Sequence, residues 1–106
     1  MRRAGHILTI MAAAAAFCAA ADVKAGQAVF ERSCKSCHGA DGTPNPAVAK
    51  MMKVDMKDLK SPEVQGRSDE EIKKVITTGK GKMRPITSIT GATADDVVAY
   101  IRTLKK

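Results

Sequence analysis

The chain is poor in the large aromatic residues from which small proteins usually build a core. Its 106 residues include no Trp, one Tyr and two Phe. One of the two, Phe17, lies in an N-terminal stretch that we expect to be removed. The remaining part, about 85 residues, is near the size at which side chains alone barely supply a stable core. An apolar core made only of side chains would therefore be thin.

Histidine and cysteine are also scarce, which limits the metal sites that the chain can build. A structural zinc site needs four ligands, usually as two separated pairs. Beyond the residues around Cys34, the chain offers only Cys18 and His6, both near the N-terminus. The strand-rich surroundings of a thioredoxin-like dithiol are missing as well. Zinc, dithiol exchange and a plain Cys34–Cys37 disulfide are thus the weaker interpretations.

Residues 1–21 are typical of an export signal. Two arginines precede an alanine-rich apolar stretch, and small residues at 19–21 suit cleavage after Ala21, with Ala25 as a second site. The stretch is shorter than the ~20 apolar residues of a membrane span. An uncleaved anchor and lipidation at Cys18 are the alternatives, and the bulky Phe17 disfavours the second. We expect residues 22–106 to form one exported domain without further disulfides.

The most informative stretch is Cys34-Lys35-Ser36-Cys37-His38. Two cysteines three apart, followed at once by histidine, are the attachment signature of c-type haem. Each thiol adds across one vinyl group of the porphyrin, and His38 is then carried under the iron. A buried haem would also supply the large flat apolar body that the scarcity of aromatic residues leaves missing. Attachment and export both predict a periplasmic protein.

The rest of the chain is predicted to be helical, with loops near the haem. Helices are expected from about Asp22 to Ser33, Ser68 to Thr78 and Thr93 to Leu104, and residues 47–60 favour a helix. Phe30 lies four residues before Cys34, so that both share one helix face. Glycines and prolines predict a loop over 39–46. A metal-bound histidine usually donates its second ring N–H, for which the carbonyl of Pro46 or Pro44 is the expected acceptor.

A second candidate ligand lies in the loop Gly79-Lys80-Gly81-Lys82-Met83-Arg84-Pro85. Met83 is held between glycines and a proline, in polar surroundings that do not suit a core methionine. A thioether is a soft ligand that suits haem iron and raises its potential. The alternatives are Met56, Met52 or Met51, and the absence of any strong sixth ligand.

Positive charge dominates the exported part. Removing Arg2 and Arg3 lowers Lys+Arg from 18 to 16 against 11 acidic residues, which leaves a net charge of about +5. We expect a basic ring around the haem edge that steers acidic redox partners. A nucleic-acid partner is not expected, because no binding motif is present. The expected members of this ring are Lys35, Lys73, Lys74, Lys80, Lys82 and Arg84.

Three matches together resemble the small class I bacterial cytochromes c. They are Gly26…Phe30…Cys34–Gly39, then Gly79–Pro85, then Asp96–Ile101. The resemblance covers residues 22–106. It implies an all-α fold of three to four helices around one covalently bound haem, in which the first and last helices cross. It further implies that Gly26 and Phe30 meet Tyr100.

The resemblance also implies the ligands and the function. His38 and Met83 would lie on opposite faces of the haem, with Pro46 as the carbonyl partner of His38. Many relatives have proline directly after the ligand methionine, whereas Arg84 intervenes here. We expect a monomeric periplasmic electron carrier, not an enzyme, which takes an electron from one redox protein and passes it to another. The alternatives are a haem subunit of a larger membrane redox complex and an open-site haem enzyme or gas sensor.

Overall fold

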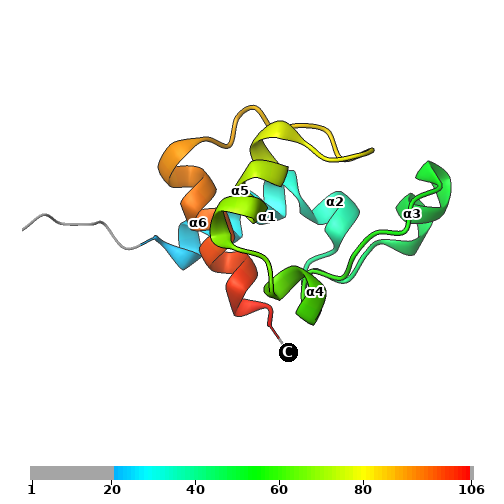
Figure 1. The fold of residues 1–106 in the computed structure, drawn as a ribbon, viewed down its shortest axis with the longest axis horizontal. Helices are drawn as coiled ribbons and strands as arrows, with labels where there is room; N and C mark the ends of the chain where they lie inside the picture. Colours follow the sequence, from blue (N-terminus) through cyan, green and yellow to red (C-terminus); the bar gives the residue numbers. More distant parts are fainter. Residues whose placement is uncertain (1–20, 106) are drawn as a thin grey trace, which may run out of the picture.

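The computed structural model of the protein describes residues 21–105, so that nearly all of the expected export signal lies outside the described residues. This part is helical (Figure 1) and contains no strand, only an isolated bridge between Lys80 and Met83. The all-α prediction is confirmed, although six helices replace the expected three to four, because two of them are single turns of four residues. The helices are α1 (Val23–Ser33), α2 (Lys35–His38), α3 (Pro46–Met52), α4 (Pro62–Gln65), α5 (Asp69–Thr78) and α6 (Gly91–Thr103).

Helix α1 begins where its sequence predicts. Asp22 is extended and its carboxylate accepts the N–H of Ala25 at 3.1 Å, which satisfies one of the free donors of the first turn. The helix ends at Ser33, and the N–H of Cys34 still donates to the carbonyl of Phe30. Cys34 is therefore placed at a defined point, one residue beyond the helix.

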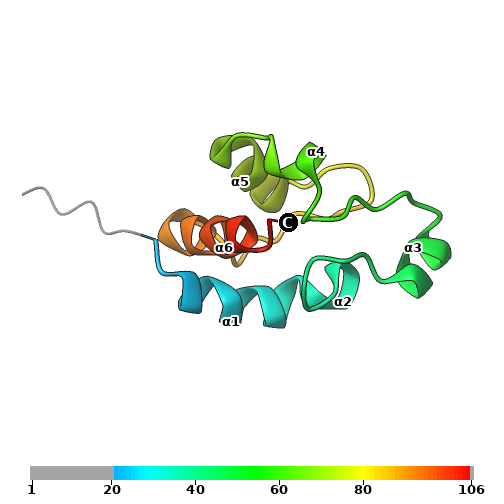
Figure 2. The ribbon, with the colours of Figure 1, turned by 90° about the horizontal axis from the view of Figure 1, so that it is seen from below.

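Helices α1 and α6 cross in close contact, as Figure 2 shows. A Cβ added to Gly26 would lie 1.9 Å from the main-chain oxygen of Asp96, so that only glycine permits this approach. Phe30 is fully buried beside the crossing, and its ring centroid lies 5.1 Å from that of Tyr100 at an interplanar angle of 59°. This tilted geometry is one that aromatic pairs prefer. The predicted crossing and the contact of Phe30 with Tyr100 are confirmed. Gly26 instead meets the main chain of Asp96 and Val97, about one turn before Tyr100.

Helix α5 packs on the other side of α6 (Figure 2). Ser68 caps it, because its hydroxyl oxygen accepts the N–H of Glu71 at 3.1 Å. Ile72 and Ile76 are buried, and Gly79 ends the helix with a φ of +78°. These features agree with the sequence, apart from the helix beginning at Asp69 rather than at its cap.

Helix α6 corrects one boundary. It begins at Gly91, with Thr90 as its cap, and not at Thr93. The carbonyl of Thr90 accepts the N–H groups of Thr93 and Ala94, so that Thr93 is already inside the helix. Asp95 and Asp96 consequently lie beyond the first turn. Asp95 instead pairs with Lys73 of α5 at 2.5 Å.

Helix α3 lies apart from the other helices (Figure 1). It takes up only the first half of the region 47–60, because Lys53 adopts a φ of +54° and the following residues are irregular. Asn45 caps it, and Pro46 occupies its first turn, so that the predicted loop ends one residue earlier than expected. No helix between residues 21 and 105 is long and apolar enough to cross a membrane.

Candidate functional site

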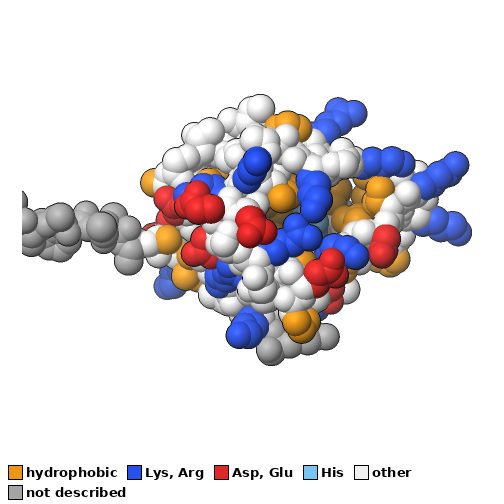
Figure 3. All heavy atoms as spheres, in the orientation of Figure 1, with side chains coloured by type: hydrophobic (Ala, Val, Ile, Leu, Met, Phe, Trp, Pro, Cys, Tyr) orange, Lys and Arg blue, Asp and Glu red, His pale blue; other side chains and the backbone are white. Residues whose placement is uncertain are grey.

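A cavity of about 650 Å³ opens between α1, α2, α5 and the two loops 52–59 and 80–86. This volume is typical of small-molecule and cofactor sites, which span roughly 300–1,000 Å³. Figure 3 shows the opening, with apolar atoms in its depth and basic side chains around it. Five of the six predicted site residues line the cavity, and Pro46 does not. The apolar part of the lining comprises Phe30, Val54, Leu59, Val64, Ile72, Val75, Ile76, Ile86 and Ile101.

The single turn α2 brings the attachment motif to one wall of this cavity. The carbonyl of Cys34 accepts the N–H groups of Cys37 at 3.3 Å and of His38 at 2.9 Å. Both thiols are free and both line the cavity, together with the imidazole of His38. The tight spacing therefore gathers two nucleophilic sulfur atoms and one nitrogen ligand on a short stretch of wall.

Burial controls the protonation of these groups. It raises the pKa of the Cys34 thiol from 9.0 to about 11, with the neighbouring Cys37 as a smaller cause. Burial also lowers the pKa of His38 below its ordinary value of 6.5. At neutral pH the imidazole is therefore uncharged, which is the form that binds a metal ion.

The second ring nitrogen of His38 has no hydrogen-bond partner in the structure. Its Nδ1 atom is buried and makes no hydrogen bond. Asn45 ties the loop back to α2 instead, since its N–H donates to the carbonyl of Cys37 at 2.9 Å. Pro46 follows in the first turn of α3 and does not line the cavity. The predicted bond from His38 to Pro46, or to Pro44, therefore stays a prediction.

Met83 reaches the same cavity from the loop after α5. Lys80 and Met83 exchange two main-chain hydrogen bonds of 3.0 Å, which close a tight turn. A Cβ on Gly79 would lie 2.6 Å from the carbonyl oxygen of Met83, so that a glycine is needed to start this loop. Both the N–H and the carbonyl of Met83 are therefore held by hydrogen bonds to Lys80.

Two of the alternative methionines also line the cavity. Met52 and Met56 belong to its lining, while Met51 is 74% exposed and does not. The geometry therefore removes Met51 from the candidate ligands. Met83 differs from Met56 in that its own N–H and its carbonyl are both bonded to Lys80 within one turn. Met52 is the last residue of α3.

The cationic rim of the cavity differs in part from the predicted basic ring. Lys35, Lys73 and Lys74 do not line the cavity. The ammonium of Lys73 pairs instead with Asp95 of α6 at 2.5 Å and with Glu70 at 3.3 Å. Lys57 and Arg67 do belong to the rim, and the sequence reasoning missed them because no helical periodicity connects them to the motif. The rim, as the structure has it, consists of Lys57, Arg67, Lys80, Lys82 and Arg84.

Two further contacts hold the walls of the cavity in place. The ammonium of Lys82 donates to the carbonyl of Met52, which joins the Met83 loop to the end of α3. On the opposite side, the hydroxyl of Tyr100 donates to the carbonyl of Ala40 at 3.3 Å, so that α6 contacts the loop after His38. The pKa of Tyr100 is raised, mainly by burial and then by Glu31 and Asp41. The phenol is therefore neutral and remains a donor at ordinary pH.

The residues of the cavity fit a covalently held haem. The apolar walls suit a porphyrin, the two free thiols suit its vinyl groups, and a neutral imidazole and a thioether suit its iron. A zinc site is not supported, because residues 21–105 bring no three His, Cys, Asp or Glu side chains together around a metal position.

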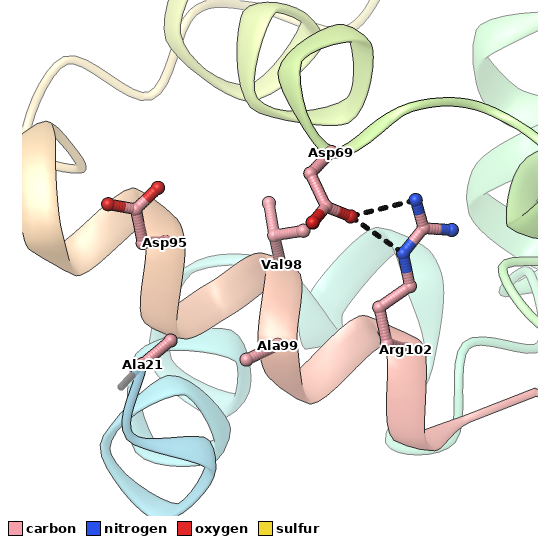
Figure 4. Close-up of a pocket in the computed structure, with 6 residues that line it drawn as sticks. All are labelled: Ala21, Asp69, Asp95, Val98, Ala99 and Arg102. Atoms are coloured by element: carbon pink, nitrogen blue, oxygen red, sulfur yellow. Dashed lines mark hydrogen bonds and ion pairs between the residues drawn. The ribbon is translucent and has the colours of Figure 1, made fainter. Parts of the chain in front are cut away.

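A smaller hollow of about 280 Å³ lies away from this cavity, against α6 (Figure 4). Its lining includes Ala21, Asp95 and the ion pair between Asp69 and Arg102, whose charged atoms are 2.8 Å apart. The described residues that line this hollow include no cysteine, histidine or methionine.

Comparisons with known proteins agree with this geometry. The family model described as cytochrome c oxidase, cbb3-type, subunit III matches residues 21–101. A solved structure of the KustC0563 c-type cytochrome superposes with a TM-score of 0.65 and 27% sequence identity, covering 76% of this chain and 98% of that one. A comparison with curated proteins gives no match.

Proposed function

The chain belongs to the cytochrome c family of cbb3-type cytochrome c oxidase subunit III, and from this premise we propose that it is an exported monohaem electron carrier with His38 and Met83 as axial ligands. The family implies one covalently bound haem c, and a c-type cytochrome carries electrons. The observation that supports the ligand assignment is the meeting of Cys34, Cys37, His38 and Met83 around one apolar cavity.

Bound haem would supply a one-electron exchange between ferrous and ferric iron. The chain would hold it through thioether bonds from Cys34 and Cys37. His38, kept neutral by burial, would provide the nitrogen ligand from α2. Met83 would provide the sulfur ligand from the loop after α5, and would raise the potential relative to a harder ligand.

The remaining walls of the cavity would shield the haem from water and would hold its ligands in a constant geometry. Phe30 and Ile76 are 0% and 3% exposed, and both contribute to the lining. The turn around Met83 is closed by two main-chain hydrogen bonds. A site held in this way needs little rearrangement when the charge on the iron changes, which suits an electron carrier better than a site that must admit substrate.

A redox titration of the purified protein tests the carrier function. We expect one iron per chain and a single reversible transition that follows a one-electron Nernst curve, with unchanged protein after several cycles. Irreversible oxidation, or turnover of peroxide at the iron, would contradict a carrier and favour an open-site enzyme.

The cationic rim supports a docking role toward acidic redox partners. Lys80, Lys82 and Arg84 surround the opening through which an electron would leave the haem. Like-signed charges around one opening attract an oppositely charged partner, and salt screens this attraction. Periplasmic or membrane-bound redox proteins with acidic surfaces are therefore the proposed donors and acceptors.

Two inorganic oxidants of opposite charge test the rim. Oxidation of the ferrous protein by ferricyanide should slow as ionic strength rises, whereas oxidation by the cationic tris(phenanthroline)cobalt(III) should accelerate. Lys80→Glu, at an exposed position of the rim, should weaken both dependences. Lys24→Glu changes the charge by the same amount at an exposed position on α1 and is the matched control. Equal effects of the two variants would contradict a local docking role.

A haem module within a larger membrane redox complex is the second candidate. The family model that matches this chain takes its name from a subunit of an oxidase. This candidate predicts that the haem protein sediments with membranes and leaves them together with other subunits. A carrier is expected in the soluble periplasmic fraction after gentle lysis of the outer membrane.

A further inference from the structure

The main-chain nitrogen of Asp22 is bound to the last helix. It donates to Oδ1 of Asp96 at 2.8 Å, across 74 positions of sequence. Asp96 belongs to the turn of α6 whose main chain packs against Gly26. In Figure 2 the chain enters α1 beside the first turns of α6. The hydrogen bond from Asp22 and the close approach of Gly26 therefore both involve Asp96, in the same turn of α6.

The two cleavage positions that the sequence allows have different structural consequences. Cleavage after Ala25 would remove Asp22, the cap of α1, together with the first three residues of that helix. It would also remove the donor to Asp96. Cleavage after Ala21 would keep the whole helix and its cap. Of the residues that the structure describes, it would remove only Ala21, an exposed residue that lines the small hollow in Figure 4.

We propose that the export signal is hydrolysed between Ala21 and Asp22, and that the α-ammonium formed on Asp22 pairs with the carboxylate of Asp96. In this step a signal peptidase adds one water to the amide, which leaves a carboxylate on Ala21 and a protonated amine on Asp22. The proposal rests on the proposed export. Processing would then strengthen the crossing of α1 and α6 instead of merely releasing the protein.

The charges around this nitrogen favour such a pair. Cleavage converts the donor to Asp96, the nitrogen of Asp22, from a neutral amide into a charged ammonium. Charge-assisted hydrogen bonds are roughly twice as strong as neutral ones. The positive end of the α1 dipole opposes a cation at this place. The carboxylates of Asp96 and of Asp22 itself offset that repulsion. The carboxylate of Asp95 is already paired with Lys73.

The intact mass of the haem protein purified after export is the first test. A mature chain that begins with Asp22 is expected. A chain that begins with Gly26 would contradict this proposal and leave the export proposal intact. A chain that retains residues 1–21 would contradict cleavage altogether, and this proposal with it, and would favour an exported protein held by an uncleaved anchor.

A double-mutant cycle then tests the ion pair. Two holoproteins are compared at pH 6, one beginning with Asp22 and one beginning with Ala21, in which the same nitrogen is an uncharged amide. Asp96→Asn should lower Tm by about 5 °C more in the first than in the second, as expected for loss of a charged partner in a domain of this size. Equal losses would contradict the pair.

Asp95→Asn is the matched control for this cycle. Asp95 is adjacent to Asp96 but pairs with Lys73, so that its loss should lower Tm equally in the two holoproteins. A larger loss in the protein that begins with Asp22 would show that the new charge acts on the whole acidic turn. It would thereby contradict a specific pair with Asp96.

Discussion

The two halves of the molecule are completed in different ways. At the crossing of α1 and α6, protein atoms pack directly on one another: Gly26 contacts the main chain of α6, and Phe30 packs on Tyr100. On the other side, α2, the irregular residues 53–59 and the Met83 loop surround a cavity of about 650 Å³. Side chains complete the first half, and a cofactor must complete the second.

This difference explains how so few aromatic residues suffice. The two aromatic residues of residues 21–105, Phe30 and Tyr100, lie together at the crossing. The cavity has an apolar lining, to which Phe30 is the one aromatic contributor among the described residues. Haem attachment is therefore expected to matter for the stability of the second half, while the crossing depends on close packing.

The largest expected effect breaks the second half. Cys34→Ala combined with Cys37→Ala removes both thiols, so that haem can no longer be held covalently. We expect complete loss of haem from the denatured protein, measured by mass spectrometry, together with loss of most stable structure around the cavity. Ser36→Ala, within the same motif, should keep the haem. Covalent haem in the double variant would contradict the attachment sites.

The next effect breaks the first half. Gly26→Ala places a Cβ 1.9 Å from the carbonyl oxygen of Asp96, a distance that forces α1 and α6 apart. We expect a loss of about 2–3 kcal/mol in the free energy of unfolding, as for other overpacked contacts. Guanidinium unfolding of the holoprotein measures it. Gln27→Ala, at the exposed neighbouring position, should change the stability by less than about 0.5 kcal/mol.

A smaller effect on stability, with a clear effect on the haem, is expected from Met83→Ala. Loss of the thioether should lower the reduction potential by on the order of 0.1–0.2 V, within the ~0.8 V range over which axial ligands move haem potentials. It should also allow CO to bind the ferrous iron. Met52→Ala and Met56→Ala remove other methionines of the cavity and should do neither. A shift in Met56→Ala instead would assign the ligand to that residue.

The smallest expected effect is on the pH dependence of stability, and it comes from the loop between α2 and α3. The pKa of Asp41 is about 2, below its ordinary value of 3.8, mainly because the N–H of Thr43 donates to its carboxylate, with further bonds from the Thr43 hydroxyl and Lys60. The stabilisation from Asp41 is present above pH 4 and is lost as the pH falls toward 2. Asp41→Asn should therefore reduce the loss of stability between pH 5 and pH 2.5. Asp55→Asn, at an exposed carboxylate, should leave that loss unchanged.

The features that the sequence predicted correctly depend on near neighbours. Asp22 and Ser68 cap their helices as expected, and Gly79 ends α5, because each acts within one turn. The motif from Cys34 to His38 is equally local, since the single turn α2 carries it along the cavity wall. The crossing of α1 and α6 was predicted from the family resemblance and not from helical periodicity.

The features that the sequence missed depend on tertiary contacts. By residue type, Thr90 and Thr93 are equally suitable N-caps for α6. The prediction of Thr93 is wrong, because the helix begins at Gly91, directly after Thr90. Lys73 was assigned to the haem edge because of its neighbours in sequence, but α6 presents Asp95 to it. Lys57 reaches the cavity from the irregular chain after α3, and Arg67 from the short segment between α4 and α5.

The most direct test of the account is an absorption spectrum of the purified mature protein, ferric and then ferrous, with CO added last. If His38 and Met83 occupy both axial positions, no position on the iron is open to CO. We therefore expect a low-spin spectrum, a weak far-red band from sulfur-to-ferric-iron charge transfer, and no change when CO is added. A high-spin spectrum that shifts when CO is added would contradict this ligation and the electron-carrier function built on it.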